Sequence, residues 1–519
     1  MVRKNFCTIK VLLITTLALL VVFIGVLIVS FVGMPLLIGD QIDKSVQLEK
    51  GTIQWDRFVN TPFGLDFKVW LFNVTNPDDI LNGETPVLKE IGPYHYVETR
   101  QKDVISTNDK EDTVKYEQYV FLNFSESLSG DLTEDDEIVL LNPVLLSMAQ
   151  LTTTIERMVL GGCLDKIFPA EYNSLFIKIN VKKVLFEGFE FAFNNADVGV
   201  ACNIVRNKVI EKTAAIRNVE TIRNGEDPSE ITSLKFSLLN YKVSNSEGVY
   251  DVFRGLADVS KLGSILRWDH STNLTNWGRL ESINNETCNK VRGTDSTIYA
   301  PGVTRDQSLE IFSTDICRIV QIEYEGEGTY KGISGYRFVT PKNTLWSSTD
   351  SPENDCFCTK QTSNEEGELS CFLDGVIDLM PCVGAPILLS FPHFLYADEK
   401  YINAISGVEE ADESIHQIYL LVEPNTGTPL EGKRRVQLNA VLRQASFLKI
   451  TESLPKAVIP LLWVEEGASL PQEYIDELND KLFNMLKLAD GVRYGLIAVT
   501  LASVLVSTGF LIRKQFFTG

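Results

Sequence analysis

Residues Val11–Ile38 read VLLITTLALLVVFIGVLIVSFVGMPLLI, a run without a single charged side chain. A helix needs about 20 apolar residues to cross the hydrocarbon core of a bilayer. A second uncharged run, Tyr494–Ile512, is just long enough to cross as well. Irregular backbone cannot stay unpaired in lipid, so both runs are predicted to be helices. The sequence therefore predicts one membrane span near each end.

A cleaved signal peptide is the main alternative for the first run. Its positive flank, with Arg3, Lys4 and Lys10, fits that alternative. However, the apolar core of a signal peptide is only about 7–15 residues long and ends at a small-residue cleavage site. The run here continues to Leu37 without a convincing A-x-A motif. We therefore expect an uncleaved anchor.

The charges beside the two spans predict the orientation of the chain. Basic residues without an acid precede the first span, and Arg513 and Lys514 follow the second. Positive flanks stay in the cytoplasm, so both termini are expected inside, at the plasma membrane. The predicted parts are a cytoplasmic tail (1–10), a span (11–38), an ectodomain (39–493), a second span (494–512) and a second cytoplasmic tail (513–519).

The predicted ectodomain is strongly acidic. The chain has a net charge of −21, and removing the five basic residues of its tails leaves −26 for the segment between them. Such a surface repels nucleic acids, which excludes them as partners. Four glycosylation sequons, all in this segment, agree with an extracellular location: Asn73, Asn123, Asn273 and Asn285.

The cysteines also indicate an oxidising compartment. Eight of the nine lie in the ectodomain, and six of these cluster between Cys288 and Cys382, which predicts disulfides. Zinc is the alternative, but Cys356-Phe-Cys358 is too tight for a zinc knuckle and no histidine lies within the cluster. Spacing alone leaves many pairings open. The two remaining cysteines, Cys163 and Cys202, could form a fourth bridge or stay free.

The ectodomain is predicted to be rich in antiparallel strands, with fewer helices. Aromatic and β-branched residues predict strands over 67–74 and 233–239, and a hairpin of 418–422 with 435–442 around Pro424-Asn-Thr-Gly427. Helices are expected from Asn142, as the cap, to Gly161-Gly162, then over 169–184, and over 471–491 leading into the second span. Their apolar stripes are interpreted first as core packing.

Catalytic motifs are absent from the sequence. The four histidines are scattered, and no G-x-S-x-G, H-E-x-x-H or Walker motif occurs. The acidic run Glu134–Glu137 lacks the glycine and spacing of a calcium loop. The residues therefore predict a receptor, carrier or channel rather than an enzyme, without a cofactor or metal.

Nine segments, in order, resemble the CD36 / class B scavenger receptor superfamily over essentially the whole chain. They are FNVTNP (72–77), EIGPY (90–94), GVYDVFRG (248–255), GTDST (293–297), DICR (315–318), CFC (356–358), FPHF (391–394), KRRVQLN (433–439) and LWVEEG (462–467). Within the superfamily, Val46–Glu49, Leu65–Val69 and Leu132–Glu137 look most like the insect sensory neuron membrane proteins.

The resemblance implies an α+β membrane protein: an antiparallel β-barrel-like ectodomain with an apical helical bundle, anchored by two terminal transmembrane helices. The family is non-enzymatic. It binds hydrophobic or anionic ligands at the apex, and an apolar tunnel passes lipids to the bilayer. In the sensory branch the cargo would be a lipid-derived odorant or pheromone, delivered toward an odorant receptor complex.

The resemblance also implies roles for individual residues. It pairs Cys288 with Cys356, Cys317 with Cys382, and Cys358 with Cys371. Cys7 matches a juxtamembrane position that is palmitoylated in some members, with an inert thiol as the equal alternative. The helices expected after Asn142 and Pro169 match the apex, which gives the ligand candidates Leu145, Met148, Leu151, Ile155, Lys166, Phe168, Phe176 and Lys178.

Two alternatives to a chemosensory lipid carrier remain. A general class B scavenger receptor for fatty acids or lipoproteins would carry a basic apex, but the matching stretch Asp165–Glu171 has mixed charge and puts the uptake of anionic particles in doubt. A two-span ligand-gated channel subunit would show a polar stripe along its pore helix. The second span instead has Gly495, Ala502 and Gly509 seven residues apart, which is more typical of a helix–helix contact.

Overall fold

The computed structural model describes residues 2–194, 198–225, 227, 229–278, 285–347, 349–360 and 362–516, without the side chains of residues 2–8, 285 and 286. The chain divides into two compact units. The first, which we call the helical unit, comprises Met1–Gln47, Lys331–Ile333 and Leu470–Gly519. The second, the sheet unit, comprises Leu48–Tyr330 and Ser334–Ser469.

The helical unit contains two long helical stretches. One runs through α1 (Val2–Ile28), the π-helical η1 (Val29–Gly33) and α2 (Met34–Val46), and the other through α15 (Gln472–Leu478), η8 (Asn479–Phe483) and α16 (Asn484–Phe516). The segments Ile9–Val46 and Gln472–Phe516 are long and apolar enough to cross a membrane. The helix predicted over 471–491 is therefore confirmed, and it continues into the second apolar run without a break.

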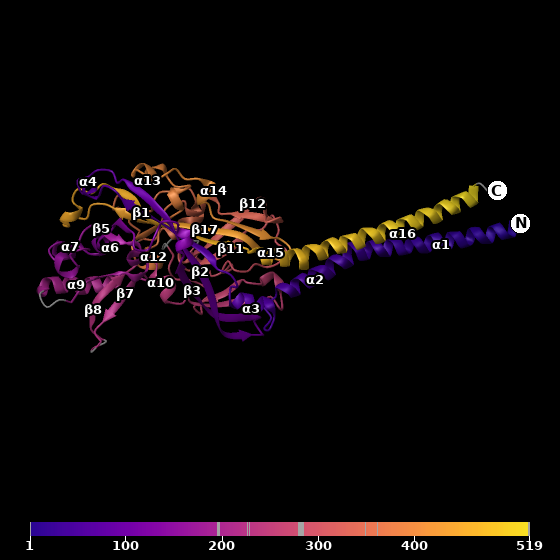
Figure 1. The fold of residues 1–519 in the computed structure, drawn as a ribbon, viewed down its shortest axis with the longest axis horizontal. Helices are drawn as coiled ribbons and strands as arrows, with labels where there is room; N and C mark the ends of the chain where they lie inside the picture. The colour runs from indigo at the N-terminus through magenta and orange to yellow at the C-terminus, as the bar shows by residue number, and fades with distance from the viewer. Residues whose placement is uncertain are drawn as a thin grey trace. The chain divides into compact units, whose positions relative to one another are not determined.

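α1 and α16 lie side by side (Figure 1). The Oγ1 atom of Thr16 and the Oγ atom of Ser507 form a hydrogen bond of 2.8 Å between them, and Ser507 is buried. Gly495 and Gly509 are exposed, with no atom within 4 Å of where a Cβ would stand. Gly495 and Gly509 thus do not pack against any of the described side chains of the first helix, and the hydrogen bond between Thr16 and Ser507 links the two helices.

The sheet unit is built on a 13-stranded antiparallel sheet. Its order is β10-β9-β3-β2-β1-β18-β17-β16-β13-β12-β11, with β15 paired to β17 and to β14. Among the described residues β10 and β11 stand at the two ends of this order and do not pair with each other, so the strands do not form a closed barrel. The strands are β1 (Leu65–Val74), β2 (Leu88–Asn108), β3 (Thr113–Phe124), β9 (Val249–Phe253), β10 (Ile265–Trp268), β11 (Leu309–Ser313), β12 (Arg318–Tyr330), β13 (Ile333–Val339), β14 (Ile377–Asp378), β15 (Ile387–Ser390), β16 (Tyr419–Glu423), β17 (Thr428–Leu442) and β18 (Ala457–Ser469).

Smaller elements complete the sheet unit. Two small sheets pair β4 (Glu137–Leu141) with β5 (Phe176–Asn180), and β6 (Phe189–Phe191) with β8 (Ile231–Phe236) and β7 (Val219–Arg223). The α-helices are α3 (Ile53–Val59), α4 (Pro77–Leu81), α5 (Glu126–Ser129), α6 (Pro143–Leu151), α7 (Thr154–Leu160), α8 (Leu164–Ile167), α9 (Gly199–Thr213), α10 (Asn240–Ser244), α11 (Asn285–Asn289), α12 (Met380–Val383), α13 (Glu399–Asn403) and α14 (Glu413–His416). Short 3-10 and π-helical turns are η2 (Lys183–Glu187), η3 (Val259–Lys261), η4 (Lys342–Leu345), η5 (Pro352–Phe357), η6 (Pro392–Phe394) and η7 (Lys449–Thr451).

The predicted hairpin is confirmed at its turn, where β16 pairs with β17, but the partner residues differ: 419–423 pairs with 428–433, whereas the predicted partner segment 435–442 pairs with β18. The register places Glu423 opposite Thr428, so residues 424–427 form the connection. Gly427 has a positive φ of 72°, which glycine adopts without strain. A Cβ there would also stand 2.5 Å from the carbonyl oxygens of Tyr299 and Ala300, so this turn requires glycine for space as well.

Two helix predictions are wrong in part. The helix from Asn142 breaks at Thr152–Thr153, because Thr153 caps a new helix, α7, through a capping box with Glu156. The helix expected over 169–184 is instead a series of turns up to Leu175, then the strand β5, with helical residues only from Val181 onward. In β5 the side chains of Ile177 and Ile179 are buried while Lys178 between them is exposed, and β4 supplies the partner strand.

Candidate functional site

Helices α6 to α9 form what we call the helical cluster. Figure 1 shows α6, α7 and α9 beside one another at one end of the sheet unit. The cluster begins at Asn142, which is fully buried, as predicted for a cap. Its Oδ1 accepts hydrogen bonds from the N–H groups of Val144 and Leu145, and its Nδ2 donates to the carbonyl oxygens of Tyr172 and Ser174. One side chain therefore fixes both the start of α6 and the loop before β5.

α7 and α9 are joined at two levels. A disulfide links Cys163, just after α7, to Cys202 on α9, which places these cysteines in a fourth bridge. At the other end of the pair, Lys212 Nζ lies 2.9 Å from Glu156 Oε2 and donates to the carbonyl oxygen of Leu151. Hydrogen bonds from the N–H of Thr153 and from Lys212 lower the pKa of Glu156 to about 2. The two helices are thus held as a rigid pair.

Four large apolar side chains on this helix pair are exposed. They are Ile155 and Met158 on α7, with 76% and 57% of their surface accessible, and Val200 and Ile204 on α9, with 81% and 60%. Residues three or four apart share one face of a helix, so each helix presents a short apolar stripe. We call these four residues the apolar patch. Clustered exposed apolar groups mark binding surfaces more often than scattered ones do.

The structure separates the predicted apex residues into two sets. Leu145, Met148, Phe168 and Phe176 are buried in the main hydrophobic core, and Leu151 is half-buried. The exposed members are Ile155, Lys166 and Lys178. Lys178 Nζ lies 2.5 Å from Glu137 Oε2, so its charge is already compensated by a neighbouring strand.

Sequence reasoning missed the contribution of α9. This helix carries apolar residues on two faces: Val205 and Val209 are buried, while Val200 and Ile204 are exposed. A single apolar stripe is the signal that identifies an amphipathic helix. Exposed Val200 and Ile204 lie outside such a single stripe, so the sequence pattern does not identify this helix. These two residues nevertheless make its exposed surface apolar.

A second region is held together by disulfides. Cys288 is bonded to Cys356, Cys317 to Cys382, and Cys358 to Cys371, the same pairs that the resemblance implied. The first two pairs overlap in the sequence, so each closed loop contains one end of the other. These bridges lie in segments with little regular secondary structure.

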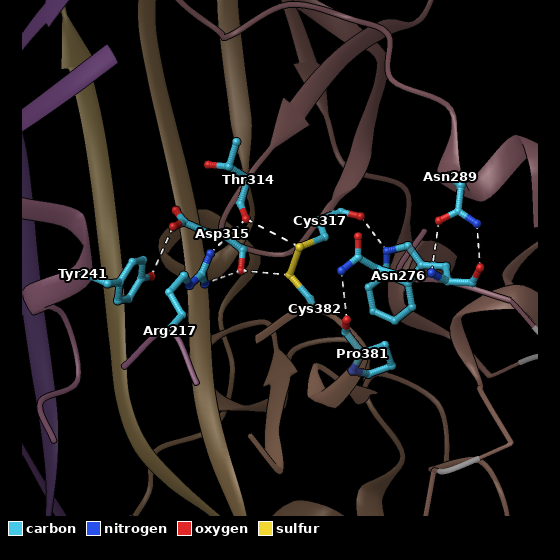
Figure 2. The surroundings of a disulfide bond; sticks show 10 residues. Arg217, Tyr241, Asn276, Asn289, Thr314, Asp315, Cys317, Pro381 and Cys382 are labelled. Carbon is cyan, nitrogen blue, oxygen red and sulfur yellow. Dashed lines mark hydrogen bonds between the residues drawn. A yellow bond between two sulfur atoms is a disulfide. The ribbon is translucent and has the colours of Figure 1, made fainter. Parts of the chain in front are cut away.

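Polar contacts surround the Cys317–Cys382 bond, as Figure 2 shows. Trp277 Nε1 donates to the carbonyl oxygen of Cys317. The guanidinium of Arg217 donates to the carbonyl oxygens of Thr314 and Asp315, and the hydroxyl of Tyr241 donates to the Asp315 carboxylate. The disulfide therefore fixes the turn that carries Asp315.

The predicted modification sites have different surroundings. Asn123 and Asn273 are exposed. Asn73 is half-buried on β1, and its Oδ1 accepts a hydrogen bond from the N–H of Val139 at 2.8 Å. The side chains of Asn285 and Cys7 lie outside those that the structure describes. Glycosylation of the asparagines and acylation of Cys7 remain predictions.

No group of three histidine, cysteine or acidic side chains suited to a metal ion occurs among the described residues. The acidic run Glu134–Glu137 is instead bound into its own turn. Asp136 accepts hydrogen bonds from the N–H and hydroxyl of Thr133, and the hydroxyl of Tyr96 donates to Glu134.

Comparison with known proteins agrees with this arrangement. The CD36 family profile matches residues 16–511. Sensory neuron membrane protein 2 of Anopheles gambiae is 32% identical, with 94% of this chain and 91% of the relative covered. The protein of that name from Drosophila melanogaster is 32% identical over 89% of this chain and 90% of its own length. Sensory neuron membrane protein 1 of Apis mellifera is 31% identical over 88% and 82%. The chain, a membrane protein with two apolar terminal helices, therefore belongs to the CD36 family.

Proposed function

We propose that this protein is a non-enzymatic cell-surface receptor and carrier for hydrophobic, lipid-derived ligands such as odorants or pheromones. The ligand binds at the apolar patch, passes through an apolar interior of the sheet unit, and leaves toward the bilayer or an odorant receptor complex. The observation that carries this proposal is the exposed patch on a disulfide-joined helix pair. The names of the relatives support the sensory role.

The energetics of the patch suit an aliphatic ligand. Each methylene that leaves water contributes about 0.8 kcal/mol, so a long chain gains most of its affinity from apolar contact alone. The bridge between Cys163 and Cys202 and the Lys212–Glu156 pair keep α7 and α9 in place before binding. Such preorganisation lowers the entropic cost of capture. Uptake of anionic particles is less well supported, since Lys178 is paired with Glu137.

Ligand capture is tested with the full-length protein in nanodiscs, titrated with hexadecanoic acid, hexadecanal and a hexadecyl ester. We expect saturable binding of at least one of the three. The double variant V200D/I204D should weaken this binding about tenfold or more, because it replaces apolar contact area by charge.

The matched control for this experiment is Leu369→Asp. Leu369 is 80% exposed but lies outside the helical cluster. This variant should bind as the wild type does. Absence of saturable binding to the wild-type protein would remove the proposed function, and unchanged binding by V200D/I204D would remove the apolar patch from it.

Orientation is tested separately. In the proposed topology both termini are cytoplasmic, and exposed Asn123 and Asn273 carry glycans. Epitope tags at either end should bind antibody only after permeabilisation of intact cells. Peptide N-glycosidase should increase the mobility of the wild-type protein, and the N123Q/N273Q variant should lose part of that shift. A tag that is detected on unpermeabilised cells would contradict the topology.

A further inference from the structure

Two ion pairs occupy adjacent positions on β17 and β18. In the antiparallel register Arg434 stands opposite Glu466, and Arg435 opposite Glu465. Successive residues of a strand point to opposite faces of the sheet. Arg434 contacts Glu466 on one face, and Arg435 Nη2 lies 2.7 Å from Glu465 Oε2 on the other. The chain thus offers two similar ion pairs that differ in the face they occupy.

Arg434 and Glu466 belong to a larger network on their own face. Lys242 Nζ lies 2.8 Å from Asp315 Oδ2 and 3.1 Å from Glu466 Oε1. Arg434 Nη2 lies 3.2 Å from the same Asp315 oxygen. Arg100 contacts Glu466 as well as its neighbour on β2, Glu98. We call this network the charge belt, and it consists of Glu98, Arg100, Lys242, Asp315, Arg434 and Glu466.

The charge belt begins where an apolar surface ends. On one face of β18, buried Leu462 and Val464 are followed by Glu466. On β2, buried Tyr94 and Tyr96 are followed by Glu98. β1 pairs with both β2 and β18. In this register the change from apolar to charged side chains occurs at nearly the same level on β2 and on β18.

The apolar side of the belt is continuous with the helical cluster. One hydrophobic core cluster contains Leu462, Val464 and Tyr94 as well as the buried α6 residues Leu145 and Met148. A ligand chain that entered from the helical cluster would therefore have aliphatic and aromatic surroundings as far as the belt. The next side chain on the same face of β18 after Val464 is Glu466, and the next on β2 after Tyr96 is Glu98.

Two of the three belt acids, Asp315 and Glu466, have lowered pKa values because cations surround them, whereas burial raises the pKa of the third, Glu98. Burial opposes ionisation, but Lys242, Arg434 and Arg217 hold the pKa of Asp315 well below its usual range. Burial is likewise outweighed at Glu466, where Arg434, Lys242 and Arg100 lower the pKa to about 2. A buried charge that loses its partner is strongly destabilising. A hydrocarbon that displaced one of these ion pairs would leave a buried charge without a partner. A head group that forms hydrogen bonds could take the place of the lost partner.

Two side chains of the belt are more accessible to solvent than the others. The side chains of Asp315 and Arg434 keep 21% and 27% of their surface accessible. By contrast, Glu98 and Lys242 keep only 1% and 5%. A head group would therefore meet the network at the Asp315–Arg434 pair, where it finds both an acceptor and a donor.

We propose that the charge belt selects ligands by their polar head: a single-chain lipid with a hydrogen-bonding head is bound at the Asp315–Arg434 pair, whereas a pure hydrocarbon is stopped at the apolar side. This inference rests on the proposed function, since it concerns a ligand that passes through the sheet unit. It names the ligand class as amphipathic rather than merely hydrophobic. Hydrogen bonds to charged groups are strong enough to give discrimination of about tenfold or more.

The test is lipid transfer into liposomes that contain the full-length protein. Radiolabelled hexadecane, hexadecan-1-ol and hexadecanoic acid are donated from cyclodextrin, and rates are compared with those of protein-free liposomes. The wild-type protein should accelerate the alcohol about tenfold more than the alkane. In Arg434→Met the ratio of the alcohol acceleration to the alkane acceleration should fall toward one. In Arg434→Lys, which keeps the charge, this ratio should be close to that of the wild type.

The matched control is Arg435→Met, which opens the ion pair on the opposite face. Arg435 Nε also donates to Glu465, so this variant loses a comparable buried contact, yet it should keep the wild-type ratio. Circular dichroism shows whether each variant is folded. If Arg434→Met does not fold, Asp315→Asn replaces it, with the same expected loss of discrimination.

The outcomes separate this inference from the function on which it rests. Wild-type protein that accelerates none of the three lipids would contradict the proposed function. Wild-type protein that accelerates all three equally would overturn the selection by head group while leaving the function intact. An unchanged ratio in folded Arg434→Met or Asp315→Asn, or an equal loss in Arg435→Met, would also overturn it.

Discussion

Removing the Cys317–Cys382 disulfide is expected to lower the free energy of unfolding of the sheet unit by about 4 kcal/mol. The two cysteines are separated by 65 residues, and a bond over a loop of that length restricts the unfolded chain strongly. The bond also holds the turn in which Arg217 and Tyr241 bind Asp315 (Figure 2). The C317S/C382S variant should therefore lose both stability and the correct position of Asp315. Chemical unfolding followed by tryptophan fluorescence measures the effect.

The Cys358–Cys371 bond gives the comparison for this prediction. Its cysteines are only 13 residues apart, so the C358S/C371S variant should lose about 3 kcal/mol, less than the first. The ordering is the informative result. A larger loss from the short loop than from the long one would show that local contacts, rather than restriction of the unfolded chain, determine the stability that these bridges contribute.

Local patterns in the sequence were sufficient for the spans and the turn of the hairpin. An uncharged run of the length of Val11–Ile38 leaves a helix as the stable choice, and the strands on either side of Pro424–Gly427 are close enough in the sequence to pair with each other. Local patterns did not predict a strand whose partner strand lies far away in the sequence. The segment Phe176–Asn180 is a strand because Glu137–Leu141 pairs with it, and nothing within 169–184 reveals that partner.

The charge belt is the clearest case of a feature that sequence patterns conceal. Glu98, Arg100 and Lys102 alternate along β2, and charged residues at every second position normally indicate a solvent-exposed face. Here their side chains keep only 1%, 11% and 1% of their surface accessible, because Glu98 and Arg100 pair with each other and acids from other elements bind Arg100 and Lys102. Among these partners, Asp295 binds Lys102 at 3.1 Å, although the two are far apart in the sequence.

A second large effect is expected from pH, and its origin is a buried pair of histidines. The rings of His393 and His416 lie 4.2 Å apart. His393 Nε2 lies 2.5 Å from Glu90 Oε2, which also accepts a hydrogen bond from the indole N–H of Trp463. His416 Nδ1 accepts a hydrogen bond from the N–H of Asp412 at 2.9 Å, so this nitrogen carries no proton.

These surroundings disfavour a charge on His416. Burial is the largest cause, followed by the electrostatic effect of the neighbouring His393 ring, and Arg435 acts in the same direction. The carboxylates of Glu90 and Asp412 oppose them only in part. The pKa of His416 is lowered from 6.5 to about 4. Protonation at Nδ1 would also break the hydrogen bond that holds the start of α14.

The sheet unit should therefore lose stability as the pH falls from about 6.5 toward 4. In this window the unfolded chain binds a proton at His416 that the folded protein excludes, so each step toward acid favours unfolding. Between pH 7.5 and pH 5 we expect a loss of about 1–2 kcal/mol from this residue. The free energy of unfolding, measured across that range, should be less pH-dependent by this amount in His416→Asn, whose side-chain oxygen can still accept from Asp412. The exposed His270→Asn control should retain the wild-type slope, and an unchanged slope in His416→Asn would assign the pH dependence to other groups.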